Sequence, residues 1–357
     1  MKLIVQPNDG AGPLVSALRK AKKSIEIAIF RFDQRAIETE LQAAAARGLK
    51  VTVLIASVNR GGVESLRKLE LRCLAAGFTV GRTNDDLARY HDKFFIIDRR
   101  TLYVLSFNFT HLDIERSRGF GIMTQNSEWV QEATSLFEAD RCRTKFKPRS
   151  NRFVVSPCNA RKSLGSFLRR ARKQLLIYDP KISDREMLGV LHERSRAGVE
   201  VRVIGRVSGD INFDVRKPLI RLHTRTIVRD HHQVFIGSQS LRASELDSRR
   251  ELGLIIRDAK TVKKVSEIFE LDWARSNESK GRDVNKQKPD RDEPKDASEV
   301  LAKELDPFTS TLKKTVKRVV LGAGEEALEE KEVKATVKKV VKRAVKQAIQ
   351  EVTQETT

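Results

Sequence analysis

Residues 90–98 read YHDKFFIID, residues 222–230 read LHTRTIVRD, and this repeated stretch decides the fold. In each copy a His is followed two residues later by a cation, and five residues after the cation by an Asp. Apolar and β-branched residues lie between them, which predicts a β-strand. Successive side chains on a strand point to opposite faces, so the His and the cation share a face. The pairs that share a face are His91 with Lys93 and His223 with Arg225.

An imidazole beside a cation suits attack on an anionic phosphodiester. The imidazole titrates near neutral pH and can act as nucleophile or as acid, while the cation can bind the non-bridging oxygens. A single His beside a basic residue on a strand is more often structural. The repeated spacing favours catalysis instead, with two half-sites that form one phosphodiester-cleaving centre.

A small polar tetrad follows each Asp after six residues, LSFN at residues 105–108 and GSQS at residues 237–240. With this block the chain resembles the phospholipase D superfamily, whose motif is His-x-Lys-x4-Asp-x6-Gly-Ser-x-Asn in two copies. The resemblance covers residues 1 to about 275. It implies two copies paired across a pseudo-twofold axis and a phosphohistidine intermediate, with no metal and no other cofactor. The chain departs from the motif at Leu105, Arg225 and Ser240, where the family has Gly, Lys and Asn.

The duplication extends beyond the motifs. Residues 17–27 align with residues 167–177 at an offset of 150, whereas the two His residues differ by only 132. The second half therefore lacks room for the helix that residues 64–76 are expected to form in the first half. Each half reads strand, helix, strand, helix, strand and motif hairpin, an alternation typical of layered α/β sheets. The expected hairpin turns are residues 98–101 and 230–233.

The predicted fold is α/β, with two tandem phospholipase D-like α/β/α sandwich repeats related by pseudo-twofold symmetry. Repeat 1 is expected at residues 1–150, and repeat 2, with a degenerate motif, at residues 151–277. Residues 278–357 are expected to form a charged, disordered linker and basic amphipathic helices, because a polar, Pro-containing stretch precedes a Val and Ala stripe opposite a Lys-rich face. This tail suits self-association or a protein partner, and a lipid surface or nucleic acid are the alternatives.

Composition limits the possible partners and location. The chain of 357 residues carries a net charge of +21. Residues 278–357 hold 18 Lys and Arg against 16 Asp and Glu, which leaves 51 against 32, or +19, in the preceding region. A basic body attracts polyanions, so an anionic phospholipid or membrane surface is one expected partner and nucleic acid another.

No apolar run reaches the roughly 18 to 20 residues that span a bilayer, and the first residues read as a strand rather than a secretory signal. The expected location is the cytoplasm, with peripheral membrane binding as an alternative. The three cysteines, in no metal-binding spacing, are expected to be buried free thiols. They are Cys73, Cys142 and Cys158.

The resemblance implies roles for the motif residues. His91 is expected to be the nucleophile and His223 the acid, with the reverse assignment open. Lys93 and Arg225 would hold the non-bridging oxygens. The residues expected to brace the motif hairpins are Asp98 and Asp230, and those expected to hydrogen-bond the phosphate are Ser106, Asn108, Ser238 and Ser240.

A further family feature is an acidic residue after the tetrad that orients the motif's own His. Glu251 lies 28 residues past His223 and is expected to orient it, whereas Gly119 holds the matching place in the first copy. His91 is then expected to lack a carboxylate unless Asp113 or Glu115 substitutes.

The expected function is a phospholipase D-like phosphodiesterase that hydrolyses or transfers the phosphatidyl group of a phospholipid, as phospholipase D and cardiolipin synthase enzymes do. A metal-independent nuclease of the same superfamily is the second possibility. The third is a catalytically degenerate module that binds phosphate or nucleic acid.

Overall fold

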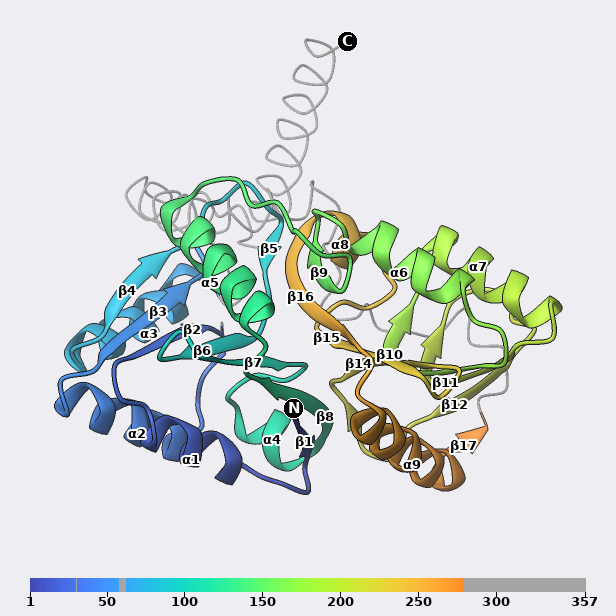
Figure 1. Cartoon of the computed structure of the whole chain (residues 1–357), viewed down its shortest axis with the longest axis horizontal. Helices are drawn as coiled ribbons and strands as arrows, with labels where there is room; N and C mark the ends of the chain where they lie inside the picture. The colour runs from blue at the N-terminus through green and yellow to red at the C-terminus, as the bar shows by residue number, and fades with distance from the viewer. Residues whose placement is uncertain (30, 58–61, 279–357) are drawn as a thin grey trace, which may run out of the picture. The chain divides into compact units, whose positions relative to one another are not determined.

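The structure is a computed structural model that describes residues 1–29, 31–57 and 62–278, all within one compact unit (Figure 1). The unit contains two mixed β-sheets, one for each expected repeat, and the α/β prediction is confirmed. The linker and helices predicted for residues 278–357 lie outside the described residues, apart from Glu278. Within the described residues, every helix is too short or too polar to cross a membrane.

The first sheet has the strand order β1-β8-β7-β6-β2-β3-β4, and β13 pairs with β8. Its strands are β1 Lys2–Gln6, β2 Ser24–Ala28, β3 Lys50–Ile55, β4 Thr79–Arg82, β6 Phe94–Ile97, β7 Thr101–Leu105, β8 Ser117–Thr124 and β13 Arg221–Leu222.

The second sheet has the strand order β17-β12-β11-β10-β14-β15-β16-β5, and β9 pairs with β16. Its strands are β5 Arg89–Tyr90, β9 Phe153–Ser156, β10 Gln174–Ile182, β11 Glu200–Val207, β12 Asp214–Lys217, β14 Arg225–Arg229, β15 Gln233–Gly237, β16 Arg249–Ile256 and β17 Asn277–Glu278.

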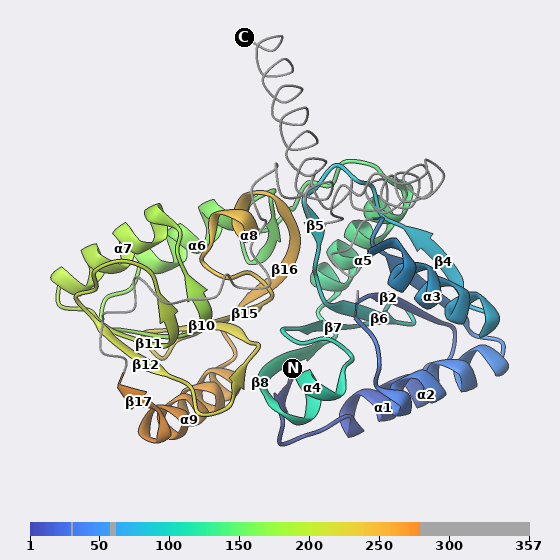
Figure 2. The ribbon, with the colours of Figure 1, turned by 180° about the vertical axis from the view of Figure 1, so that it is seen from behind.

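Two short strands cross between the repeats. β5 comes from the first repeat but runs parallel to β16 of the second, and Figures 1 and 2 both show the two strands side by side. β13 comes from the second repeat and runs parallel to β8 of the first. Each crossing strand lies directly before a motif His, so each His is carried to the sheet of the other repeat.

The helices follow the duplication. Several begin at side-chain caps, as where Asn126, Asp184 and Asp258 accept hydrogen bonds from backbone N–H groups three residues ahead. β11 runs on to β12 without a helix between them, which confirms the expected loss in the second repeat. The described helices are α1 Gly12–Arg19, α2 Arg35–Ala46, α3 Gly62–Ala75, α4 His111–Glu115, α5 Ser127–Cys142, α6 Ala160–Arg169, α7 Arg185–Arg196, α8 Ala243–Asp247 and α9 Ala259–Arg275.

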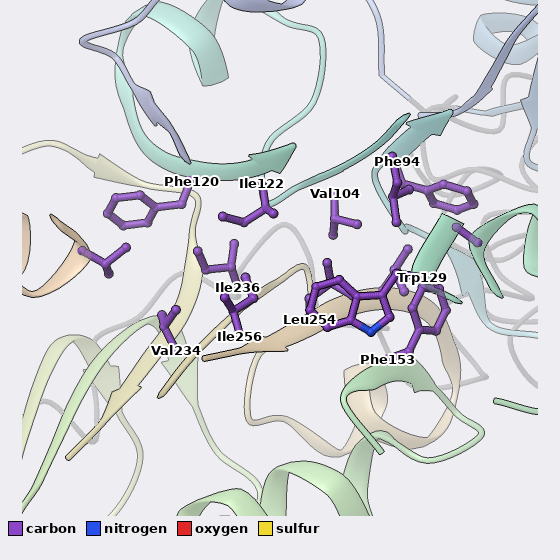
Figure 3. Packing of buried hydrophobic residues seen from close by; sticks show 14 of the residues in the cluster. Phe94, Val104, Phe120, Ile122, Trp129, Phe153, Val234, Ile236, Leu254 and Ile256 are labelled. Atoms are coloured by element: carbon purple, nitrogen blue, oxygen red, sulfur yellow. The ribbon is translucent and has the colours of Figure 1, made fainter. Parts of the chain in front are cut away.

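The motif strands are apolar throughout because both of their faces are buried. In β6, Phe94 and Ile96 face a core that the two repeats share, while Phe95 and Ile97 face a core beneath α1 and α2. Figure 3 shows the shared core, where side chains of both sheets meet. α5 and α9 also contribute to it. The two repeats therefore have a continuous apolar interface.

The predicted hairpin turns are present at the ends of β6 and β14. The first two residues of each turn have φ between 52° and 55°, the left-handed conformation of a tight hairpin. The Asp98 carboxylate accepts hydrogen bonds of 2.6–3.1 Å from the backbone N–H groups of residues 22–24. Asp230 does the same with residues 172–174, at 2.7–3.1 Å. Both carboxylates thus bind the turn to the preceding helix–strand junction.

The cysteine prediction is wrong in part. Cys73 is a buried free thiol, but Cys142 and Cys158 are exposed. Cys142 is the last residue of α5, and Cys158 lies in the turn between β9 and α6. The helix end and the turn present these two side chains to solvent.

Candidate active site

His91 lies at the contact between the repeats. Its backbone N–H donates to the Arg250 carbonyl at 2.8 Å, which continues the pairing of β5 with β16. This register brings the next residue of β16, Glu251, to the imidazole, with His91 Nδ1 2.9 Å and 3.1 Å from the two carboxylate oxygens. Glu251 therefore holds the Nδ1–H tautomer, and the Nε2 lone pair of His91 points the other way.

The expected pairing of Glu251 with His223 is wrong. The spacing of 28 residues finds the correct position on the strand, but the crossing of β5 gives that position to His91, the His of the other copy. The expected substitutes do not serve His91 either. Asp113 lies beside His223, and Glu115 contacts His111 at the surface.

His223 occupies the matching place in the first repeat. Its backbone N–H donates to the Arg118 carbonyl at 3.1 Å, which places it beside Gly119. Its Nδ1 lies 2.8 Å from the Ser106 carbonyl oxygen, and its Nε2 lies 3.4 Å from an Asp113 oxygen. The His without a carboxylate at Nδ1 is therefore His223, and a backbone carbonyl fixes its tautomer instead.

Gly119 has a packing reason. A Cβ at this position would lie 2.8 Å from Phe107 Cδ1, closer than side chains normally approach. The first repeat uses this space for the buried ring of Phe107, so a glutamate equivalent to Glu251 does not fit there.

The two motif cations make similar contacts. Lys93, which is fully buried, has its Nζ 3.0 Å from His91 Nε2 and donates to the His91 carbonyl at 2.6 Å. Arg225 Nη1 donates to the His223 carbonyl at 3.1 Å. The positive charge of Arg225 lowers the pKa of His91, and that of Lys93 lowers the pKa of His223. Each cation thus acts on the His of the other motif, as expected for one shared centre.

Burial dominates the protonation of the site. It lowers the pKa of His91 well below its ordinary value and that of His223 to about 3, although Asp113 opposes the second shift. Both imidazoles are therefore neutral. Burial also lowers the pKa of Lys93 to about 7 and raises that of Glu251 to about 7, and the attraction between these two groups opposes both shifts.

The tetrad serines make different contacts. The Ser106 hydroxyl accepts from the Phe120 N–H at 2.9 Å, and the Ser238 hydroxyl accepts from the Leu252 N–H at 3.2 Å. These contacts tie each tetrad to the next strand. The Ser240 hydroxyl accepts from Arg225 Nε at 3.3 Å. Phosphate binding by the three serines stays a prediction.

Two buried acids were missed in the sequence. Asp113 accepts from the backbone and side-chain N–H groups of Asn108, at 2.9 Å and 2.7 Å, so the predicted phosphate ligand Asn108 holds an acid. Glu245 accepts from the Ser240 backbone N–H at 2.8 Å. Each acid lies five residues after the last residue of its tetrad. This second repeated spacing was a usable signal.

Comparisons with known proteins agree with the two-repeat fold. A family model described as "Cardiolipin synthase, PLD-like domain" matches residues 14–141 and 208–273, more than half of the chain. Mitochondrial cardiolipin hydrolase of Mus musculus is 30% identical over 129 residues, which are 35% of this chain and 55% of that protein. The human protein of the same name is 30% identical over 139 residues, 38% and 51% of the two chains. The chain thus spans about half the length of the curated relatives it matches.

Two solved structures share the fold. A polyphosphate kinase from Porphyromonas gingivalis superposes with a TM-score of 0.64 and 21% identity, over 86% of this chain and 55% of that one. A phosphatidylserine synthase from Haemophilus influenzae superposes with a TM-score of 0.60 and 12% identity, over 78% and 87%. At these identities the likeness concerns the fold alone.

Proposed function

The chain belongs to the phospholipase D-like family that includes cardiolipin synthase, and we propose that it is a phosphodiesterase that cleaves or transfers a phosphatidyl group through a phosphohistidine intermediate. The observation that carries the proposal is the contact between Glu251 and His91 Nδ1. A carboxylate at Nδ1 leaves Nε2 unprotonated and stabilises the positive charge that the imidazole gains during attack. This contact supports His91 as the nucleophile.

In the first step, His91 Nε2 attacks phosphorus. The N–P bond forms while the bond to the leaving alcohol oxygen breaks, and protonated His223 gives its Nε2 proton to that oxygen. His223 keeps its Nδ1–H on the Ser106 carbonyl, so the acid is the imidazolium. Asp113, 3.4 Å from His223 Nε2, favours that charged form.

In the second step, water or an acceptor alcohol loses its proton to the now neutral His223 and attacks the phosphorus. The N–P bond breaks, and His91 is released. Each acid or base contribution is worth about 10² to 10⁴ in rate.

The cations stabilise the phosphate. Lys93 Nζ lies 3.0 Å from His91 Nε2, close to where a non-bridging oxygen would come during attack by that nitrogen. Arg225 is charged at any pH and offers a planar pair of donors for the other oxygen. The Arg at this place in the second motif therefore supports phosphate binding.

A phosphatidyl substrate is supported by the family description and by the names of the curated relatives. The basic body adds support, because +19 of the net charge lies before residue 278. A nucleic acid presents the same phosphodiester chemistry, so the test must include it.

The test is a parallel assay of the full chain in EDTA on anionic phospholipid vesicles and on single- and double-stranded DNA and RNA. Turnover of phospholipid with labile phosphorus label on His91 after acid quenching is the expected result. Cleavage of nucleic acid alone contradicts the lipid substrate, and label on His223 reverses the two roles. Binding without turnover of either class means that the chain is a degenerate phosphate-binding module.

A further inference from the structure

The two repeats differ beside their equivalent buried acids, Asp113 and Glu245. Each acid accepts the backbone N–H of the last tetrad residue of its own repeat. The positions three residues before and four residues after each acid differ in charge. These residues are Thr110 and Ser117 in repeat 1, and Arg242 and Arg249 in repeat 2.

The arginines of repeat 2 converge on the one acid. Arg249 Nη1 lies 3.1 Å from Glu245 Oε1, and Arg242 Nη1 lies 3.8 Å from the same oxygen. Arg225 Nη2 lies 3.8 Å from Glu245 Oε2. Arg89 is the register partner of Arg249 where β5 pairs with β16. We call Arg89, Arg225, Arg242 and Arg249 the arginine cluster.

The arginine cluster lies beside the proposed nucleophile. Arg89 and Arg249 flank the strand pair that holds His91 against Glu251. After burial and Lys93, the charges of Arg89, Arg225 and Arg249 lower the pKa of His91. The pKa of His223 is instead supported by Asp113. One side of the centre is therefore cationic, and the other is partly neutralised by an acid.

The cluster is enclosed to the same degree as the catalytic groups. Its four side chains belong to residues that are 4–9% exposed, and His91 is 8% exposed. Guanidinium groups bind phosphate oxygens in pairs through their planar N–H fork, and they bind best where water is largely excluded. The scissile phosphodiester already has Lys93 and Arg225, so a second anionic group suits the rest of the cluster.

We propose that Arg242 and Arg249, with Arg89, form a subsite for a second phosphate group of the substrate, next to the phosphodiester that His91 attacks. The inference rests on the proposed function, because it adds to the same site. A substrate with two phosphates in one molecule would bridge His91 and this subsite. A diphosphatidyl lipid or a 5′-phosphorylated nucleotide chain supplies this chemistry.

The first test measures binding and needs no turnover. Isothermal titration calorimetry of the full chain should show pyrophosphate binding at least about tenfold more tightly than orthophosphate. Arg242→Thr, which installs the residue of repeat 1, should lower this ratio roughly tenfold and leave orthophosphate affinity within about twofold. Equal affinity for the two probes in the wild type, or an unchanged ratio in Arg242→Thr, overturns the subsite.

Two further variants make this test robust. Arg202→Thr is the matched control, because Arg202 has a side chain 13% exposed and pairs with Glu270 on a different strand. It should keep the wild-type ratio. If Arg242→Thr fails to fold by circular dichroism, Arg242→Gln replaces it and is held to the same expected ratio.

The second test identifies the source of the second phosphate. The ratio of kcat/KM is measured for diphosphatidylglycerol over phosphatidylglycerol in mixed micelles, and for a dinucleotide with and without a 5′-phosphate. A preference for the two-phosphate member of the lipid pair, lost in Arg242→Thr, is expected. The same result in the nucleotide pair alone overturns the lipid source, and no preference in either pair overturns the subsite. A chain without turnover leaves the calorimetric test to decide, so failure of the subsite and failure of the proposed function are distinguishable.

Discussion

His91 and His223 stand in the same motif position but in different surroundings. A carboxylate holds Nδ1 of His91, and a backbone carbonyl holds Nδ1 of His223. The carboxylate makes its imidazole a better nucleophile, while the carbonyl fixes a tautomer without adding charge. This difference assigns the two roles in the proposed mechanism.

Glu251→Gln should lower kcat/KM by about 10² to 10⁴, because the amide keeps the shape but no longer stabilises the charged imidazole. Glu132→Gln is the matched control, since Glu132 is equally buried but binds the backbone N–H groups of residues 149 and 150. Steady-state rates of both variants test this. Full activity in Glu251→Gln would remove the proposed role of the carboxylate.

His91→Ala and His223→Ala should each abolish turnover while the melting temperature stays near that of the wild type. Both groups act in one step, so the double variant should lose no more activity than either single variant. Rates and thermal melts of the three variants are the measurement. Substantial activity in one of the single variants contradicts a shared centre.

The pH dependence of kcat/KM should be bell-shaped with a maximum near pH 7. Glu251 takes up a proton as the pH falls through its pKa of about 7, and Lys93 loses its proton as the pH rises through its pKa of about 7. A bound phosphate anion favours charged Lys93, so the alkaline limb of kcat should move to higher pH. Lys93→Arg keeps the charge at high pH and should remove that limb from kcat/KM. Identical profiles for the two proteins would exclude Lys93 as its cause.

At the scale of elements, the crossing strands β5 and β13 create the site. Each is only two residues long, yet each pairs with the opposite sheet and fixes the register of the His that follows. β5 meets Glu251 at that register, whereas β13 meets Gly119, because the first repeat fills the space with Phe107.

Gly119→Glu should therefore destabilise the chain by about 1 to 3 kcal/mol through overpacking, without raising the rate. Gly189→Glu on α7 is the control, because a Cβ there meets no atom within 4 Å. It should leave stability unchanged or raise it slightly, since Gly is a poor helix former. Urea denaturation of both variants measures the difference. Faster turnover in Gly119→Glu would show that the site accepts a second carboxylate.

At the scale of the whole described unit, the two repeats depend on one another. Ile236 of β15 and Val104 of β7 belong to the core between the sheets (Figure 3), and the catalytic contacts also cross between repeats. Separation of the sheets would remove Glu251 from His91 and His223 from Ser106. Stability and activity should therefore be lost together.

Ile236→Ala should lower the free energy of unfolding by about 2 to 5 kcal/mol, because the side chain is fully buried in the shared core. Its activity and its circular dichroism signal should be lost at the same temperature. Leu71→Ala on α3, where the residue is 57% exposed, should change stability by about 0.5 kcal/mol or less. Loss of activity well below the melting temperature would show that the repeats separate before they unfold.

The sequence by itself determined the duplication, the motif strands, the turns at Asp98 and Asp230, and the missing helix between β11 and β12. These features are local, because side-chain periodicity, turn residues and the length between two strands leave a direct trace in the chain. The positions that hold the site were also predictable, since the motif spacing is repeated. The acids Asp113 and Glu245 show the same regularity.

Only the tertiary structure decided which groups serve which His. The spacing from His223 to Glu251 gives the register of a residue within its repeat, but partners are chosen by the strands that lie side by side. β5 and β13 each cross to the other sheet, so Glu251 orients His91 and the Ser106 carbonyl orients His223. This exchange results from packing between the repeats, which the order of residues along either repeat does not encode.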